Sequence, residues 1–186
     1  MANSTERFTD RVENYSKYRP TYPAGVINLL KSECGLSPES DVADIGSGTG
    51  ILAKLLLRNC KRVFGVEPNA AMRDAGKALL KNYPTFITVA GSAENTTLPD
   101  ASIDLITAGQ AFHWFDEMKA RVEFKRILKS GGFVALVWND RRLDSTPFLA
   151  AYEQLLREFG TDYAQVQDFD VANLLFERFH NSSTIG

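Results

Sequence analysis

Apolar positions along the chain follow two alternating spacings from residue 24 onward. Short apolar runs are typical of buried strands, and apolar residues that recur every three or four positions are typical of helices. The runs that predict strands are Val42–Ile45, Arg62–Glu67, Phe86–Ala90, Ser102–Ala108 and Phe133–Trp138. The segments that predict helices are Ala24–Glu33, the stretch after Gly50 that carries Ile51, Leu52, Leu55 and Leu56, Ala70–Lys81, Met118–Lys129 and Phe148–Phe159.

The alternation of these segments predicts an α/β fold. Strands and helices that alternate in this way form a doubly wound, mainly parallel sheet with helices on both faces. The expected strand order is 3-2-1-4-5. After Thr161 the pattern weakens: Val171–Phe179 predicts one further helix, and Asn181–Gly186 is polar without a strand signal.

The predicted helix Met118–Lys129 is amphipathic. The residues expected to face the core are Val122, Ile127 and Leu128. The residues expected to face solvent are Glu123, Lys125 and Arg126. The run Ser130–Gly131–Gly132 predicts the end of this helix before the fifth strand.

Composition places the chain among globular proteins with one sizeable core. Hydrophobic residues make up 44% of its 186 residues and charged residues 24%,. The net charge of -2 gives no basic field, so we expect no nucleic-acid partner,. Since no apolar stretch approaches the roughly 20 residues that cross a bilayer and the start is polar, we expect no membrane association and a cytoplasmic location. Cys34 and Cys60 have no metal-type spacing, and we predict no metal site,.

A glycine-rich turn follows the first strand and reads Asp44-Ile45-Gly46-Ser47-Gly48-Thr49-Gly50. Strand, glycine turn, helix and strand form the unit that binds adenosine-containing cofactors, because glycines let a ligand approach the backbone closely. A bare tight turn is the alternative. The turn lacks the Gly-Lys-Ser/Thr ending of a nucleotide-binding P-loop. Ile51 stands where the dinucleotide fingerprint has its third glycine, so an NAD site is the second candidate,.

Two acidic residues flank this unit. Asp44 lies at the end of a strand expected to be buried on both faces, where an unpaired carboxylate costs several kcal/mol. A cationic ligand or the N–H groups of the loop itself would stabilise it. Glu67 ends the second strand, 23 residues later, which is a typical spacing for an acid that accepts hydrogen bonds from a ribose diol,.

Together with Val66-Glu67-Pro68-Asn69, the glycine turn resembles motifs one and two of class I S-adenosylmethionine-dependent methyltransferases. The resemblance implies that the cofactor is S-adenosyl-L-methionine, that Glu67 holds the ribose hydroxyls, and that Pro68 belongs to the cofactor-binding residues. The residues that it places at the methionine and adenosyl parts are Asp44, Gly46, Ser47, Gly48, Thr49 and Gly50. It also implies that Ala93 and Glu94, in the turn after the third strand, approach the adenine.

The fourth strand continues as an apolar and aromatic run, Gln110-Ala111-Phe112-His113-Trp114-Phe115, where cofactor and substrate should meet,. We assign Gln110 to the cofactor site. Phe112, His113 and Trp114 are assigned to the wall of the substrate pocket. His113 is the candidate general base, and a packed or orienting histidine is the alternative.

The run Gln110–Phe115 and the early segment Tyr15–Pro23 resemble the branch of type 11 methyltransferases that contains trans-aconitate methyltransferases. In that branch N-terminal tyrosines and an arginine close over the cofactor. We therefore expect Tyr18 in the substrate pocket and Arg19 on the methionine carboxylate, which suits the paired donors of a guanidinium. Arg141, after the fifth strand, is a candidate for holding an anionic substrate, with a solvated charge pair as the alternative.

Methyl transfer from a sulfonium is a one-step displacement that needs alignment and exclusion of water more than acid/base groups. A carboxylate acceptor needs no base, whereas a phenol, enol or amine benefits from one. The predicted function is therefore methyl transfer to a small molecule, with a carboxylate as one candidate acceptor. An NAD-linked oxidoreductase and a non-catalytic S-adenosylmethionine-binding module are the alternatives.

The family usually adds a sixth strand and an antiparallel seventh, and the sequence shows neither pattern after the fifth strand. We expect one domain over residues 1–186: a cap and first helix (1–40), a cofactor-binding core (41–140) and an incomplete C-terminal part (141–186). An open edge on the fifth strand leaves both a monomer and a homodimer as expectations.

Overall fold

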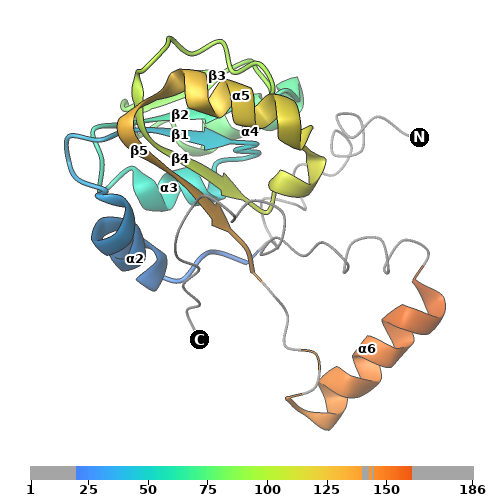
Figure 1. Cartoon of the computed structure of the whole chain (residues 1–186). Helices are drawn as coiled ribbons and strands as arrows, with labels where there is room; N and C mark the ends of the chain where they lie inside the picture. The colour runs from blue at the N-terminus through green and yellow to red at the C-terminus, as the bar shows by residue number, and fades with distance from the viewer. Residues whose placement is uncertain (1–19, 140–142, 144, 161–186) are drawn as a thin grey trace. The chain divides into compact units, whose positions relative to one another are not determined.

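Five parallel strands form one sheet in the order β3-β2-β1-β4-β5 (Figure 1). This computed structural model describes residues 20–139, 143 and 145–160 of the chain. The strands are β1 (Asp41–Ile45), β2 (Arg62–Val66), β3 (Phe86–Val89), β4 (Ile103–Gly109) and β5 (Leu128–Val137). The predicted fold class and strand order are confirmed.

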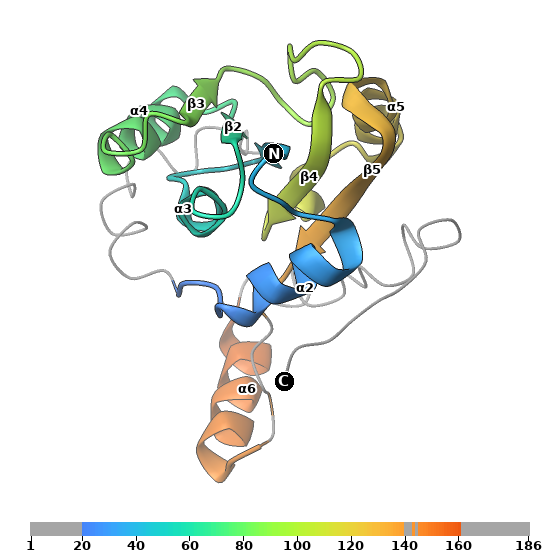
Figure 2. The ribbon, with the colours of Figure 1, turned by 90° about the vertical axis from the view of Figure 1, so that its left-hand side faces the viewer.

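Helices cover both faces of this sheet, as the sequence predicts. They are α2 (Gly25–Cys34), α3 (Ile51–Leu56), α4 (Ala70–Leu79) and α5 (Glu117–Ile127), with a short 3₁₀ turn η2 (Phe112–Trp114). Figure 1 shows α2 and α3 on one side of the sheet and α5 on the other. Figure 2 turns the molecule so that α3 and α5 are seen on either side of β4.

Two apolar cores fill the space between these layers. The first joins α2 and α3 to side chains of the sheet that include Val42 and Leu105. The second joins α5 to the opposite face of the same strands, through side chains that include Ala43 and Ile106. Every residue of β1 is buried, so the carboxylate of Asp44 lies inside the protein, as predicted,.

Local capping sets where the helices near the glycine turn begin and end. The side chain of Asn69 accepts a hydrogen bond from the Met72 N–H at the start of α4, and Asp116 does the same for α5,. Gly35 ends α2 with φ of 66°, a left-handed conformation that favours glycine,. The predicted helix Ala24–Glu33 is thus confirmed, with bounds that differ by one residue at each end.

The predicted orientation of α5 is wrong at two positions. Val122 is 71% exposed, whereas Glu123 is only 7% exposed. The helix faces the sheet with Ala120, Phe124 and Ile127, and the helical period places residue 123 on that same side,. Burial of a glutamate is tolerated here because its carboxylate has partners of its own.

The predicted helix stop at Ser130–Gly132 is also wrong. The helix ends at Ile127, and β5 runs from Leu128 through these residues to Val137. Gly131 has φ of 77° inside the strand, and the register with β4 shifts between Ile103 and Leu105. The glycines thus permit a bulge in an edge strand instead of ending the helix.

Residues 139–186 form a second unit, and its described helix is α6 (Pro147–Phe159). The Thr146 hydroxyl accepts a hydrogen bond from the Leu149 N–H at its start, with Pro147 in the first turn,. The predicted helix is confirmed. The predicted helix Val171–Phe179 lies outside the described residues, as do Tyr18, Arg19 and Arg141.

The described helices are all too short or too polar to cross a membrane. Within residues 20–139, 143 and 145–160, no group of histidine, cysteine and acidic side chains is arranged to hold a metal ion.

Candidate functional site

The glycine turn after β1 has a backbone that only glycine adopts easily. Gly46, Gly48 and Gly50 have φ values of 68°, 55° and 83°,. A Cβ on Gly46 would lie 2.6 Å from the Cβ of Ala111, and a Cβ on Gly50 would lie 2.6 Å from Leu80 Cδ1. The turn therefore requires glycine at positions 46 and 50 for its own conformation and packing.

Backbone N–H groups tie this turn to the end of β2. The N–H groups of Gly46 and Ser47 both donate to the carbonyl oxygen of Val66, at 2.8 and 3.1 Å. The N–H of Gly48 donates to Glu67 Oε2 at 2.9 Å, and the N–H of Asn69 donates to Glu67 Oε1 at 2.9 Å. The loops after β1 and β2 thus share one carboxylate.

The Glu67 carboxylate is 9% exposed and is held from two sides. Burial raises its pKa above the usual value, and the N–H groups of Asn69 and Gly48 oppose this rise. A carboxylate oxygen has two lone pairs, so each oxygen retains acceptor capacity for a hydroxyl. Arg73 donates to the carbonyl oxygens of Glu67 and Pro68, each at 2.7 Å, and so fixes the loop behind the acid.

The Asp44 carboxylate lies at the other end of the turn and is 1% exposed. Its Oδ1 accepts a hydrogen bond from the Thr107 hydroxyl at 2.9 Å. Its Oδ2 is buried with no hydrogen-bond partner among the residues that the structure describes, and the same holds for Thr49 Oγ1. Burial is the main cause that raises the pKa of Asp44 to about 7, against the lowering effect of Thr107.

The turn after β3 is fastened to α5. Ala93 is buried in the second core, and the Glu94 carboxylate accepts a hydrogen bond from the Asp116 N–H at 2.8 Å. Further along, the N–H and the hydroxyl of Thr96 both donate to Glu123 Oε1, at 2.8 and 2.5 Å. The buried Glu123 thereby ties this loop to α5.

The aromatic run after β4 packs on the glycine turn and on the end of β5. Phe112 is buried and contacts Phe115 edge-on, with ring centroids 5.6 Å apart. The imidazole of His113 lies between Trp114 and Trp138, with centroid distances of 4.8 and 5.7 Å. His113 is half-buried, and Trp114 is 44% exposed, so the run forms a partly open wall.

Gln110 begins this wall in a strained conformation. Its φ is 55°, which is uncommon for a residue with a side chain, and its N–H donates to the carbonyl oxygen of Val137,. Positive φ at such a residue costs about 1 kcal/mol or more, and such residues cluster at functional sites, although Thr97 and Ala101 also have positive φ here,. The strain supports the assignment of Gln110 to the site.

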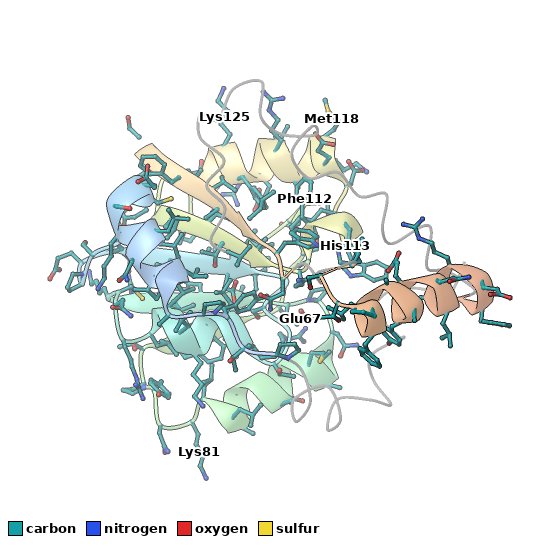
Figure 3. All side chains as sticks on the ribbon, turned by 90° about the horizontal axis from the view of Figure 1, so that it is seen from below. Glu67, Lys81, Phe112, His113, Met118 and Lys125 are labelled. Atoms are coloured by element: carbon teal, nitrogen blue, oxygen red, sulfur yellow. The ribbon has the colours of Figure 1, made fainter. Side chains whose placement is uncertain are left out.

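The predicted site residues that the structure describes lie at one edge of the sheet, because parallel strands end on the same side. The turns after β1, β2, β3 and β4 carry Gly46–Gly50, Glu67, Ala93–Glu94 and Gln110–Trp114. Figure 3 shows the labelled side chains of Glu67, Phe112 and His113 at this end of the sheet. Lys125 and Met118, by contrast, project away from the sheet on the outer side of α5.

Sequence reasoning missed Thr107, and it named Tyr22 only as part of the segment Tyr15–Pro23. Thr107 is a fully buried polar residue in an otherwise apolar strand, at the register position opposite Asp44, and that combination is the signal for it. Tyr22 packs on the end of β4: a Cβ on Gly109 would lie 2.5 Å from the Tyr22 hydroxyl. Its place was not derivable from spacing, since Tyr22 lies far from Gly109 in sequence.

Residues 43–136 match the family described as "Methyltransferase domain". The chain belongs to this family. The matched residues include the glycine turn, Glu67, Thr107 and the aromatic wall Gln110–Phe115. This membership favours the methyltransferase prediction over the NAD-linked alternative.

Individual relatives agree with this assignment. An uncharacterized methyltransferase of Schizosaccharomyces pombe is 33% identical over 152 residues, which span 81% of this chain and 59% of the relative. A Saccharomyces cerevisiae protein named probable S-adenosylmethionine-dependent methyltransferase is 27% identical over 128 residues, 66% of this chain and 43% of that protein. The chain thus spans less than two thirds of the length of these relatives.

A solved structure shares the fold. The protein from Anaeromyxobacter dehalogenans, assigned as a type II methyltransferase, matches with a TM-score of 0.63 and 28% sequence identity. The match covers 80% of this methyltransferase chain and 63% of the other.

Proposed function

We propose that this methyltransferase-family chain binds S-adenosyl-L-methionine at the glycine turn and transfers its methyl group to a small molecule. The observation that carries the proposal is the pair of buried carboxylates at the two ends of the turn. Glu67 keeps acceptor capacity on both oxygens, and Asp44 Oδ2 is buried without a partner within the described residues. A ribose diol suits the first acid and an ammonium group suits the second.

The strand order supports one orientation of the cofactor. Glu67 follows β2, beside β3, so the nucleoside half belongs over β2 and β3, near Ala93. Asp44 ends β1 beside β4, so the amino-acid half belongs over β1 and β4, near Gln110. The acceptor then belongs at the aromatic wall of Phe112, His113 and Trp114.

The bound cofactor supplies a sulfonium methyl group, which is the electrophile of the reaction. The residues of the chain hold the two partners in line and keep water away from them. The buried Phe112 and the packed rings of His113, Trp114 and Trp138 provide the apolar surface for this task. Most of the catalytic effect is therefore expected from alignment.

We further propose a carboxylate as the acceptor group, as in the branch that contains trans-aconitate methyltransferases. A carboxylate is ionised at neutral pH and needs no base for attack. The proposal relies on the likeness of Gln110–Phe115 to that branch and on Arg141 as a candidate partner of an anionic acceptor.

Calorimetric titration with S-adenosylhomocysteine and with NAD tests the cofactor. We expect binding of the first only, and an affinity loss of about tenfold or more in D44N and in E67Q, since each removes a charge-assisted contact. D74N, on the exposed side of α4, is the matched control and should bind like wild type. Unchanged affinity in both site variants, or binding of NAD alone, would overturn the proposal.

Transfer of labelled methyl to small carboxylic acids then tests the reaction. Label found on an acid only in the presence of intact Asp44 and Glu67 supports catalysis at this site. Tight cofactor binding with no label on any acceptor would instead make the chain a binding module.

A further inference from the structure

Thr107 is a buried polar side chain whose place is set by the pairing of β1 with β4. The register pairs residues 44 and 107 directly, and Thr107 is 0% exposed. A buried hydroxyl needs a hydrogen-bond partner to offset its desolvation, and here the partner is Asp44 Oδ1 at 2.9 Å,. An apolar β-branched residue of equal size, such as valine, would suit this strand position without that requirement.

The Thr107 hydrogen bond makes the two oxygens of Asp44 unequal. Oδ1 is engaged, while Oδ2 has no partner in the part of the chain that the structure describes. The terminal torsion of an aspartate is broad, so a carboxylate without such a contact would not have a fixed plane. The hydroxyl therefore selects which oxygen is presented and in which direction.

We propose that Thr107 is the positioning residue of the cofactor site, fixing the Asp44 carboxylate so that Oδ2 faces the ammonium group of the cofactor's amino-acid half. The inference rests on the proposed function, because it assumes that this group binds over β1 and β4. Thr107 itself contacts the carboxylate and is not expected to touch the reacting atoms.

The same hydrogen bond favours the ionised form of Asp44. The groups that act on the carboxylate are Thr107 from β4, the backbone of Ala53 from α3, and the charge of Glu67 from the end of β2. Thr107 and Ala53 lower the pKa of Asp44, whereas burial and Glu67 raise it. Without the hydroxyl the pKa rises further, so at neutral pH the acid is neutral and makes a weaker contact with an ammonium group.

Two ligands separate this role from a general structural one. S-adenosylhomocysteine carries both halves of the cofactor, and 5′-methylthioadenosine lacks the amino-acid half. At pH 7, T107V should bind the first about tenfold more weakly, the effect of one charge-assisted hydrogen bond, and bind the second like wild type.

Three further variants complete the calorimetric experiment. T107S keeps the hydroxyl and should bind both ligands like wild type. T107A also lacks the hydroxyl and replaces T107V if the valine variant does not fold. T88V, the same substitution on β3, is the matched control and should change neither affinity.

The outcomes are distinct. A loss confined to S-adenosylhomocysteine, rescued by T107S, supports the positioning role. An equal loss of affinity for both ligands, or no loss for either, overturns the positioning role. The proposed function still stands in both cases, because the wild-type chain binds S-adenosylhomocysteine. If the wild-type chain binds neither ligand, the proposed function fails, and this inference fails with it.

Discussion

Two acidic residues at one loop have different environments, and these predict different behaviour. Glu67 receives two backbone N–H groups, whereas Asp44 Oδ1 accepts from the Thr107 hydroxyl and Asp44 Oδ2 has no hydrogen-bond partner within the described residues. Burial raises the pKa of both, and that of Asp44 reaches about 7. Because their hydrogen-bond partners differ, the two carboxylates are suited to different ligand groups. Here one suits a neutral diol and the other a cation.

His113 is the residue whose role depends on the acceptor. Its ring packs between Trp114 and Trp138, which suits a wall as well as a base. With a carboxylate acceptor, H113N should retain kcat/KM to within about tenfold, because no proton has to be removed. The measurement is the steady-state rate of methyl transfer to that acid.

A loss of about 10²-fold or more in H113N with the same acid, at unchanged S-adenosylhomocysteine affinity, would make His113 a general base and contradict a carboxylate acceptor. W114F, a neighbour on the same turn that cannot carry a proton, is the control for changed packing alone.

Among the elements, the loop after β3 is held by a network that the sequence pattern did not indicate. Arg126 donates to Glu123, to Asp100 and to the carbonyl oxygen of Leu98, while Glu123 accepts from Thr96. The hydrogen bonds of Arg126 are the main cause that lowers the pKa of Glu123 to about 2. This acid is therefore ionised throughout the physiological range, and it ties the predicted adenine loop to α5.

Substitution E123Q keeps the shape of this side chain and removes its charge. We expect the variant to lose about 1–3 kcal/mol of unfolding free energy, the usual effect of a hydrogen bond to a charged group. Amide exchange should also become faster in residues 91–100, and 5′-methylthioadenosine should bind more weakly. Thermal unfolding, hydrogen exchange and calorimetry measure these effects.

The control for this network is K125Q, since Lys125 projects from the outer side of α5 (Figure 3). It should match wild type in all three measurements. Slow exchange of residues 91–100 in E123Q, equal to wild type, would show that the loop is held by its other contacts alone.

The features that could be predicted from the sequence are those set by local patterns, and the others depend on contacts between residues distant in sequence. The strands and helices, the glycine turn and Glu67 follow from local pattern, because apolar spacing and turn residues act over a few positions. The strand order follows instead from the rule for doubly wound sheets. The burial of Glu123 and the bulge at Gly131 follow from partners distant in sequence, namely Thr96 and β4. Thr107 stood out only once the register of β1 with β4 was known.

For the molecule as a whole, the buried carboxylate of Asp44 lowers the free energy of unfolding at neutral and alkaline pH. The pKa of Asp44 is raised to about 7 in the folded chain and is near 4 in the unfolded chain,. The folded state therefore binds this proton more tightly, and the group favours folding below pH 4. That contribution is lost as the pH rises through 7, and at pH 8 the buried charge costs about 2–4 kcal/mol of unfolding free energy.

Substitution D44N removes this titrating group, so it tests whether the Asp44 carboxylate lowers the free energy of unfolding. Relative to wild type, the unfolding free energy of D44N should rise by about 2–3 kcal/mol between pH 5 and pH 8, measured by denaturant unfolding at each pH. Any effect of the amide on packing is independent of pH and cancels in this difference. D74N should show no such trend, since Asp74 is exposed. Parallel curves for D44N and wild type would mean that Asp44 titrates normally, and the same variant's weaker cofactor binding would then need another cause.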